Sequence, residues 1–376
     1  MRPVVPIAIA SIILAVSAGC RAPDRLRFTR TETRTIELKQ GGQLYATTFN
    51  GAISVEGWER DEVSIIAQIR ERREGDVRFN VESKDGRVEI TAEQNNPRKV
   101  VIGFNFVSSG VSYTLKIPRK TATTLIVSNG RIEMSQIDDE IDASTSNGSI
   151  AINEIGGAAK LTTKNGSISA KSVKGDLLAR TSNGGFDVKD IKGSADLRTT
   201  NGRIEVRGVS GRLEAVTSNG PIIAENITGN AELGTTNGRV EARDIKGNTD
   251  INTSNGAIIA ENLENDLTGR SSNGRIDIQR VFGGIEATTS NSSIKAVDLN
   301  GKGRGISLTT TNASIEVTLG QAQGALEASA VGGHRSVIIE TPNVQPTTDG
   351  SVIRTRIGNS DQPIVLKTTN SRITVR

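Results

Sequence analysis

The sequence predicts an all-β fold: a single-stranded parallel β-helix (β-solenoid) with about 18 residues per coil, a β-rich N-terminal cap and irregular C-terminal coils. An asparagine returns at every eighteenth position without insertion or deletion, Gly follows nine of the ten, and an apolar residue stands three positions further on. A constant period of this length is typical of stacked repeats. The ten asparagines are Asn129, Asn147, Asn165, Asn183, Asn201, Asn219, Asn237, Asn255, Asn273 and Asn291.

Within each unit, apolar residues stand three, five and eight positions after the asparagine, and a glycine usually stands at the tenth. Apolar residues two positions apart indicate strands with one buried face. We expect the bends at Asn-Gly and at the later glycine, because both residue types tolerate positive φ.

An antiparallel meander is the alternative, since Asn-Gly between alternating runs is the strongest hairpin signal. The constant length favours the solenoid, because stacked coils of unequal length would lose their register. Six residues after successive asparagines, the charges alternate in sign. A coil of one repeat places these opposite charges on neighbouring strands, whereas a coil of two repeats would stack like charges. The four residues are Arg207, Glu225, Arg243 and Glu261.

Large and small residues alternate at the positions six and four before the asparagine. Interdigitation would fill a narrow core in this way, but duplication of a two-unit ancestor would leave the same pattern. The alternation breaks at Leu267/Gly269 and Ile285/Ala287, where we expect the regular stack to end. The alternating pairs are Ile141/Ala143, Ala159/Leu161, Leu177/Ala179, Ala195/Leu197, Leu213/Ala215 and Ala231/Leu233.

The asparagine column has a structural and a functional interpretation. In the first, each side-chain amide bonds to the next coil, as stacked Asn residues do in other parallel strands. In the second, the column is a polar stripe that binds sugar, metal or ice. We favour the structural ladder. Strand alternation points the Thr two positions before each asparagine inward, with the apolar residues.

Residues 1–19 are predicted to be a signal peptide, with a positive Arg2 and a short apolar stretch over residues 7–16. The segment 16–20, Val-Ser-Ala-Gly-Cys, resembles a bacterial lipobox, which implies that Cys20 is acylated and anchors the protein to a membrane. Ordinary cleavage after Ala18 is the alternative. Arg21, in place of the Asp that signals retention in the inner membrane, favours the outer membrane by the same resemblance. Cys20 is the only cysteine, so a structural disulfide is excluded.

The rest of the chain divides by the period. Residues 20–30 are predicted to be a lipidated tether, 31–120 an N-terminal β cap, 121–301 the regular solenoid, and 302–376 the C-terminal coils and second cap. Caps are needed because end strands expose unpaired backbone. Asn50 falls outside the period, Asn312 and Asn370 repeat the motif late, and residues 342–350 are expected to form a loop. The strands expected in the cap are 34–38, 43–48, 52–55, 63–69, 77–81, 87–92 and 111–117.

Few residues suggest chemistry. The net charge of +4 is spread evenly, without the basic stripe of a nucleic-acid binder. Catalysis on a polysaccharide needs clustered carboxylates, but the four acids that stand four residues after their asparagines, mostly near an Arg, are expected to form a solvated strand face. We expect Asp138-Asp139-Glu140 to be an exposed turn and His334, the only histidine, to be a surface residue. No enzyme activity, cofactor or metal is predicted. The four acids are Asp187, Glu205, Glu241 and Asp277.

Three stretches carry a family resemblance: 49–58 (Phe-Asn-Gly-Ala-Ile-Ser-Val-Glu-Gly-Trp), 111–118 (Val-Ser-Tyr-Thr-Leu-Lys-Ile-Pro) and the serial Asn-Gly-x-Ile units. Together they resemble a bacterial family of β-strand repeat lipoproteins known as putative adhesins. The resemblance implies a parallel β-helix and supplies no catalytic residues.

The function we expect is that of a non-catalytic lipoprotein of the bacterial cell envelope. It would act in adhesion or as a rigid scaffold, with a protein or glycan ligand along the solenoid face. The alternative is a carbohydrate-active β-helix enzyme, a polysaccharide lyase or hydrolase.

Overall fold

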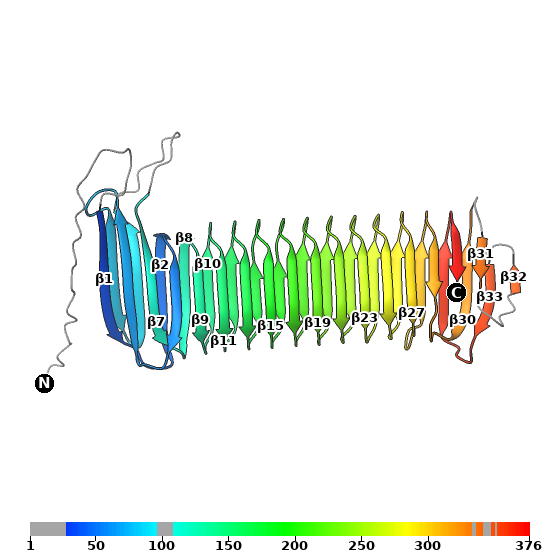
Figure 1. The fold of residues 1–376 in the computed structure, drawn as a ribbon, viewed down its shortest axis with the longest axis horizontal. Helices are drawn as coiled ribbons and strands as arrows, with labels where there is room; N and C mark the ends of the chain where they lie inside the picture. The colour runs from blue at the N-terminus through cyan, green and yellow to red at the C-terminus, as the bar shows by residue number, and fades with distance from the viewer. Residues whose placement is uncertain (1–27, 96–107, 333–335, 341–346, 350–351) are drawn as a thin grey trace. The chain divides into compact units, whose positions relative to one another are not determined.

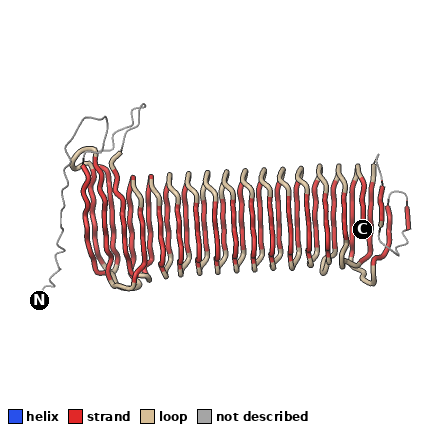
Figure 2. The backbone as a smooth tube through the Cα atoms, viewed as in Figure 1, coloured by secondary structure: helices blue, strands red, loops and turns tan. Residues whose placement is uncertain are grey.

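The computed structural model describes residues 28–95, 108–332, 336–340, 347–349 and 352–376 (Figures 1 and 2). The predicted signal peptide, Cys20, the tether up to residue 27 and His334 lie outside these residues. The described part contains strands and turns but no helix, so it holds no helix that could cross a membrane. Its strands form two long, mostly parallel sheets, which we call A and B. The prediction of an all-β fold is confirmed.

The chain divides into two compact units, residues 1–184 and 185–376. In unit 1, sheet A contains β1 (Phe28–Glu37), β3 (Ile53–Trp58), β4 (Glu62–Glu71), β7 (Gly110–Pro118), β9 (Ile132–Ile137), β11 (Ile150–Ile155) and β13 (Ile168–Val173). Sheet B of unit 1 contains β2 (Gly42–Asn50), β5 (Val77–Lys84), β6 (Arg87–Gln94), β8 (Thr121–Asn129), β10 (Ile141–Thr145), β12 (Ala159–Thr163) and β14 (Leu177–Arg180).

Unit 2 continues both kinds of strand. Its sheet A contains β15 (Phe186–Ile191), β17 (Ile204–Val209), β19 (Ile222–Ile227), β21 (Val240–Ile245), β23 (Ile258–Leu263), β25 (Ile276–Val281), β27 (Ile294–Leu299), β29 (Ile315–Thr318), β31 (Ser336–Ile339) and β35 (Arg372–Val375). Its sheet B contains β16 (Ala195–Arg198), β18 (Leu213–Thr217), β20 (Ala231–Thr235), β22 (Thr249–Thr253), β24 (Leu267–Ser271), β26 (Ile285–Thr289), β28 (Ile306–Thr310), β30 (Gly324–Ala330), β32 (Thr347–Asp349), β33 (Val352–Ile357) and β34 (Pro363–Thr368).

Successive repeats pair in parallel within each unit. In unit 1, Ile150 lies opposite Ile132 on one side and Ile168 on the other. In unit 2, β17, β19, β21, β23, β25 and β27 lie side by side in the same register (Figure 1). Each repeat gives one strand to sheet A and one to sheet B, so apolar columns from the two sheets face each other across the core. An antiparallel meander of the repeats is excluded.

The core alternates large and small side chains between neighbouring coils. Ile141 lies opposite Ala159 in unit 1, and in unit 2 Leu213 lies between Ala195 and Ala231. All of these side chains are buried. The expectation that the regular stack ends where the pattern breaks is wrong. Leu267 still pairs with Ile285, and Ile285 with Ile306. Parallel pairing needs the backbone register, which the irregular pairs keep.

The segment before the repeats contains all seven expected strands. β2 pairs with β8 and places Asn50 opposite Asn129, although the two are 79 residues apart. Between them the chain forms β3 to β7, in which β4 runs antiparallel to both β1 and β7, and β5 runs antiparallel to β6. Both edge strands, β1 and β5, are rich in charged residues, which discourages pairing with another chain.

The C-terminal strands also return to the stack. β34 and β35 pair with β28 and β29, and Thr368 lies opposite Thr310. The expected loop at 342–350 contains a strand, β32, which pairs with β33; the rest of that segment lies outside the described residues.

Candidate interaction surfaces

Each coil turns at two corners. The asparagine corner comprises the residues from two before to one after the repeat asparagine. At it, the amide Nδ2 of one asparagine donates to Oδ1 of the asparagine in the preceding coil. The bond from Asn147 to Asn129 is 2.6 Å, and that from Asn255 to Asn237 is 2.7 Å. The column extends beyond the ten predicted residues, since Asn129 donates to Asn50 and Asn370 to Asn312.

The Thr two positions before the asparagine is buried, as strand alternation predicted. In unit 2, Thr235 donates through Oγ1 to the carbonyl of Gly220 in the preceding coil (3.1 Å) and accepts from the amide of Gly238 in its own coil (3.1 Å). One hydroxyl therefore satisfies two backbone groups that the turn leaves without strand partners.

The glycine after the asparagine allows a close approach between coils. A Cβ added to Gly238 would lie 1.8 Å from the carbonyl oxygen of Gly220, well inside van der Waals contact. Its φ is not positive, so our expectation of a left-handed bend here was wrong. Gly is required because the backbones of neighbouring coils touch.

The left-handed residue is instead seven positions after the asparagine, at the corner where a sheet A strand ends. We call the positions seven to ten after the asparagine the opposite corner. At position seven φ lies between 53° and 77° in all ten repeats. This column was missed because its residues differ in size and charge, although Asp, Asn and Gly, which tolerate this conformation, are enriched in it. The column is Gln136, Glu154, Ser172, Asp190, Gly208, Asn226, Asp244, Asn262, Arg280 and Asp298.

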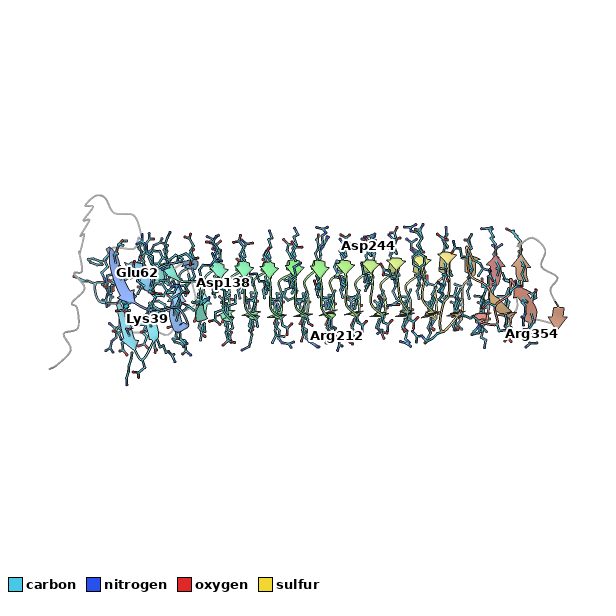
Figure 3. All side chains as sticks on the ribbon, turned by 90° about the horizontal axis from the view of Figure 1, so that it is seen from below. Lys39, Glu62, Asp138, Arg212, Asp244 and Arg354 are labelled. Carbon is cyan, nitrogen blue, oxygen red and sulfur yellow. The ribbon has the colours of Figure 1, made fainter. Side chains whose placement is uncertain are left out.

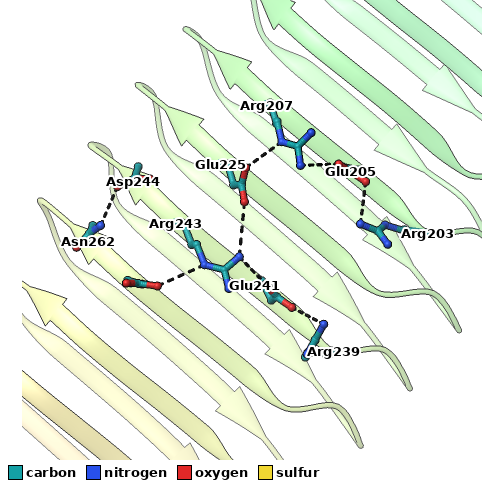
Figure 4. Close-up of polar contacts among 10 residues, drawn as sticks. Arg203, Glu205, Arg207, Glu225, Arg239, Glu241, Arg243, Asp244 and Asn262 are labelled. Carbon is teal, nitrogen blue, oxygen red and sulfur yellow. Dashed lines mark hydrogen bonds and ion pairs between the residues drawn. The ribbon is translucent and has the colours of Figure 1, made fainter.

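The outer face of sheet A in unit 2 carries a lattice of ion pairs (Figure 4). Arg207 pairs with Glu225 at 2.9 Å, and Glu225 pairs with Arg243 at 3.6 Å; these residues lie opposite each other on neighbouring strands. Arg243 continues the chain to Glu261 at 3.4 Å. The alternating charges of the sequence therefore meet across strands, where opposite charges attract.

Glu241 departs from the expected solvated face. It is only 6% exposed, beneath Arg239 at 2.5 Å and Arg243 at 2.6 Å. Its neighbours across the sheet are the apolar residues Ile223 and Ile259. A buried carboxylate needs such paired cations, because an unpaired buried charge is costly. The other three acids of this set are half-exposed.

The outer face of sheet B carries a column of carboxylates. Asp196, Glu214, Glu232 and Asp250 follow one another in register. Arg198 and Arg212 bridge members of the column, and Arg212 lies on the opposite side of unit 2 from Asp244 (Figure 3). A groove of about 560 Å³ runs beside the column, lined largely by Ser and Thr side chains of the asparagine corner.

Asp138 lies in the exposed turn expected at 138–140, between β9 and β10, and binds Arg119. The hydrogen bond from Arg119 (2.8 Å) holds the pKa of the Asp138 carboxyl below its usual value. In the cap, burial raises the pKa of the Tyr113 phenol above its usual value, and the hydroxyl donates to the carbonyl of Thr47. Among the residues that the structure describes, no group of three or more His, Cys, Asp or Glu could hold a metal ion.

Comparisons with known proteins give one family and several solved structures, including the following two. The family model described as Toastrack DUF4097 matches residues 47–243. One structure is titled a putative cell adhesion protein from Clostridium sporogenes; it is 10% identical, with a TM-score of 0.23, over 93% of this chain and 99% of that one. The other is titled a putative lipid binding protein from Parabacteroides distasonis; it is 15% identical, with a TM-score of 0.25, over 74% and 96%. A search of curated proteins finds no match.

Proposed function

The chain belongs to the Toastrack DUF4097 family, and from that premise we propose a non-catalytic lipoprotein that acts in adhesion or as a rigid scaffold of the bacterial cell envelope. Its residues 121–301 form a single-stranded parallel β-solenoid with one repeat per coil, capped by residues 31–120 and by the C-terminal coils. The parallel register of neighbouring repeats supports this architecture.

The observation that carries the proposal is the cross-linking between neighbouring coils. Each coil in the regular part of a unit is joined to the next by backbone pairing, an asparagine bond and a Thr or Ser hydroxyl bond, as for the coils of Asn219 and Asn237. A stack joined at every level resists bending and presents fixed rows of side chains on two faces. Such rows suit a spacer or a surface for contact with another molecule.

The location of the protein rests on residues 1–20. The signal peptide would direct export and an acylated Cys20 would hold the protein in the envelope, with the outer membrane favoured by Arg21. Replacement of Cys20 by Ala is expected to move the protein from the membrane fraction to the soluble fraction of lysed cells, and Arg21→Ala, which leaves the acylated residue in place, serves as the control. Retention of the Cys20→Ala protein in the membrane would contradict the anchor.

The adhesion role is tested with cells that express or lack the protein, allowed to settle on surfaces coated with host or envelope glycans and proteins. The proposal expects fewer attached cells, or a weakened envelope, when the protein is absent. The competing enzyme is tested by incubating the purified chain with acidic and neutral polysaccharides. Reproducible shortening of a polysaccharide would overturn the non-catalytic role.

A further inference from the structure

A second groove, of about 330 Å³, follows the opposite corner of unit 2 across four coils. One wall is formed by the left-handed residues and the other by the side chains two positions further on. Three strand spacings make it roughly 14 Å long. The first wall is Asn226, Asp244, Asn262 and Arg280, and the second is Thr228, Lys246, Glu264 and Phe282.

Hydrogen bonds hold three residues of the first wall, Asp244, Asn262 and Arg280, in place. Asn262 donates through Nδ2 to Oδ1 of Asp244 at 2.9 Å, a contact drawn in Figure 4, and accepts from Nε of Arg280. Arg280 is also bound to Glu261. These groups retain further capacity, since an amide has a second N–H, a carboxylate has several lone pairs, and a guanidinium has five donors. Polar groups fixed before a ligand arrives lower the entropic cost of binding it.

Phe282 closes one end of the groove. It is 52% exposed, the most exposed large apolar side chain among the described residues. The backbone amide of Phe282 donates to the carbonyl of Leu263 at 2.9 Å, and this bond fixes the backbone from which the Phe282 side chain projects. In neighbouring coils the same position is occupied by the polar residues Lys246, Glu264 and Asn300. The ring therefore serves no packing role that the repeat requires.

The charges of the groove select among ligands. Lys246 and Arg280 are balanced by Asp244 and Glu264, so the groove has no net charge to attract a polyanion or a polycation. An exposed aromatic face attracts polarised C–H groups, because its π system carries a negative quadrupole. Rows of amide and carboxylate groups beside such a face match a molecule that presents C–H bonds on one side and hydroxyls around its edge.

We propose that this groove binds a short neutral oligosaccharide, with one sugar ring stacked on Phe282 and the hydroxyls of the rings along the groove bound by Asn226, Asp244 and Asn262. The inference rests on the proposed adhesion role, for which it names the ligand class and the residues. A protein partner fits less well, because a single exposed aromatic ring among charged side chains lacks the apolar surroundings of an interface core.

Calorimetric titration of the purified full chain with chitotriose and with cellotriose tests the site, with trigalacturonate as the acidic comparison. We expect saturable binding of a neutral trisaccharide and weaker binding of trigalacturonate. Phe282→Ala is expected to weaken the neutral ligand by about tenfold, and Phe282→Tyr, which keeps the ring, to preserve it. Asn226→Gly removes an amide where Gly208 shows that the backbone accepts glycine, and is expected to weaken binding severalfold.

Ile126→Ala is the matched control, because it removes an exposed apolar side chain from β8, far from the groove in sequence; binding is expected to be unchanged. Equal affinity in the wild type and Phe282→Ala, a preference for trigalacturonate, or no binding of either neutral trisaccharide would overturn the site. These measurements use purified protein, so they are separate from the cell assays. If Phe282→Ala cells still attach normally, adhesion stands and this groove is not its surface.

Discussion

The two corners of each coil turn the chain from one sheet to the other, and they do so in different ways. At the asparagine corner the sequence is nearly uniform, and Asn, Thr and Gly each contact the preceding coil, as Asn237, Thr235 and Gly238 do. At position seven of the opposite corner the backbone is equally uniform, with left-handed φ in all ten repeats, but the side chains vary from Ser172 to Arg280.

The difference shows where the fold constrains the sequence. The left-handed turn at position seven constrains the backbone but leaves the side chain outside the core. Positions seven and nine are therefore free to vary and to carry a ligand site, although the residue at position eight is buried and the glycine at position ten touches the preceding coil. The asparagine corner places side chains between coils, where a change affects two turns at once. We expect substitutions at the first corner to change stability and substitutions at the second to change binding.

The largest expected effect is that of Gly238→Ala. The new Cβ would overlap the carbonyl of Gly220, so the coils must separate, and we expect a loss of about 3 kcal/mol in the free energy of unfolding, the upper end for overpacked sites. Gly234→Ala in β20 is the control, because its Cβ would meet only Val216 at 3.8 Å. Urea unfolding checks both; an equal loss in the two variants would contradict the close-approach argument.

Thr235→Val should be the next largest. It leaves the carbonyl of Gly220 and the amide of Gly238 without their hydroxyl partner, at a cost of about 2 kcal/mol. Thr249 is also buried, but its hydroxyl has no hydrogen-bond partner, so Thr249→Val is expected to be neutral or stabilising. Thermal unfolding of the two variants measures the difference. If Thr249→Val loses more stability than Thr235→Val, the Thr column does not act through its hydroxyls.

Asn237→Ala is expected to cost about 1 kcal/mol. It removes the bonds to Asn219 and from Asn255, but both are exposed to water, which replaces part of their energy. Asn252→Ala, outside the column, removes only a bond to Asp250 in its own strand and should cost less. The stabilising role of the ladder stays a prediction until this comparison is made by chemical denaturation, and equal costs would count against it.

The smallest effect is expected at Ser172, in the opposite corner. Ser172→Gly relieves a left-handed non-glycine residue but adds chain entropy to the unfolded state, so we expect a change within about 0.5 kcal/mol. Ser172→Val should cost about 1–2 kcal/mol, because a branched side chain tolerates this conformation poorly. A tolerated Val, measured by thermal unfolding, would show that the corner relaxes to another backbone conformation.

The repeat period predicted much of the fold. The strands and their parallel stacking could be predicted because equivalent residues of successive repeats lie opposite each other, and each coil contacts only its neighbours. The sequence did not predict that Asn50 and Asn370 join the asparagine column. They are separated from their partners Asn129 and Asn312 by 79 and 58 residues, which are not multiples of the period. The left-handed column was missed because a backbone conformation shared by Gly208 and Arg280 has no single chemical signature.

Less of the candidate sites could be predicted. The asparagine column was found because it repeats, whereas the groove at Phe282 depends on a residue that breaks the repeat. The burial of Glu241 was missed because its neighbours across the sheet, Ile223 and Ile259, stand one full repeat away on either side in the sequence. Repetition in a sequence identifies the residues that stack, and the departures from it become informative only once the register is known.

The most direct test of the division between the corners is thermal unfolding of two variants with and without chitotriose. Asn226→Gly should keep the melting temperature of the wild type but show a smaller rise with the ligand, since only binding to the folded state raises it. Asn237→Ala should melt lower and keep the full rise. If Asn226→Gly shows the full rise of the wild type, or Asn237→Ala loses the rise without melting lower, the corners do not divide stability and binding between them.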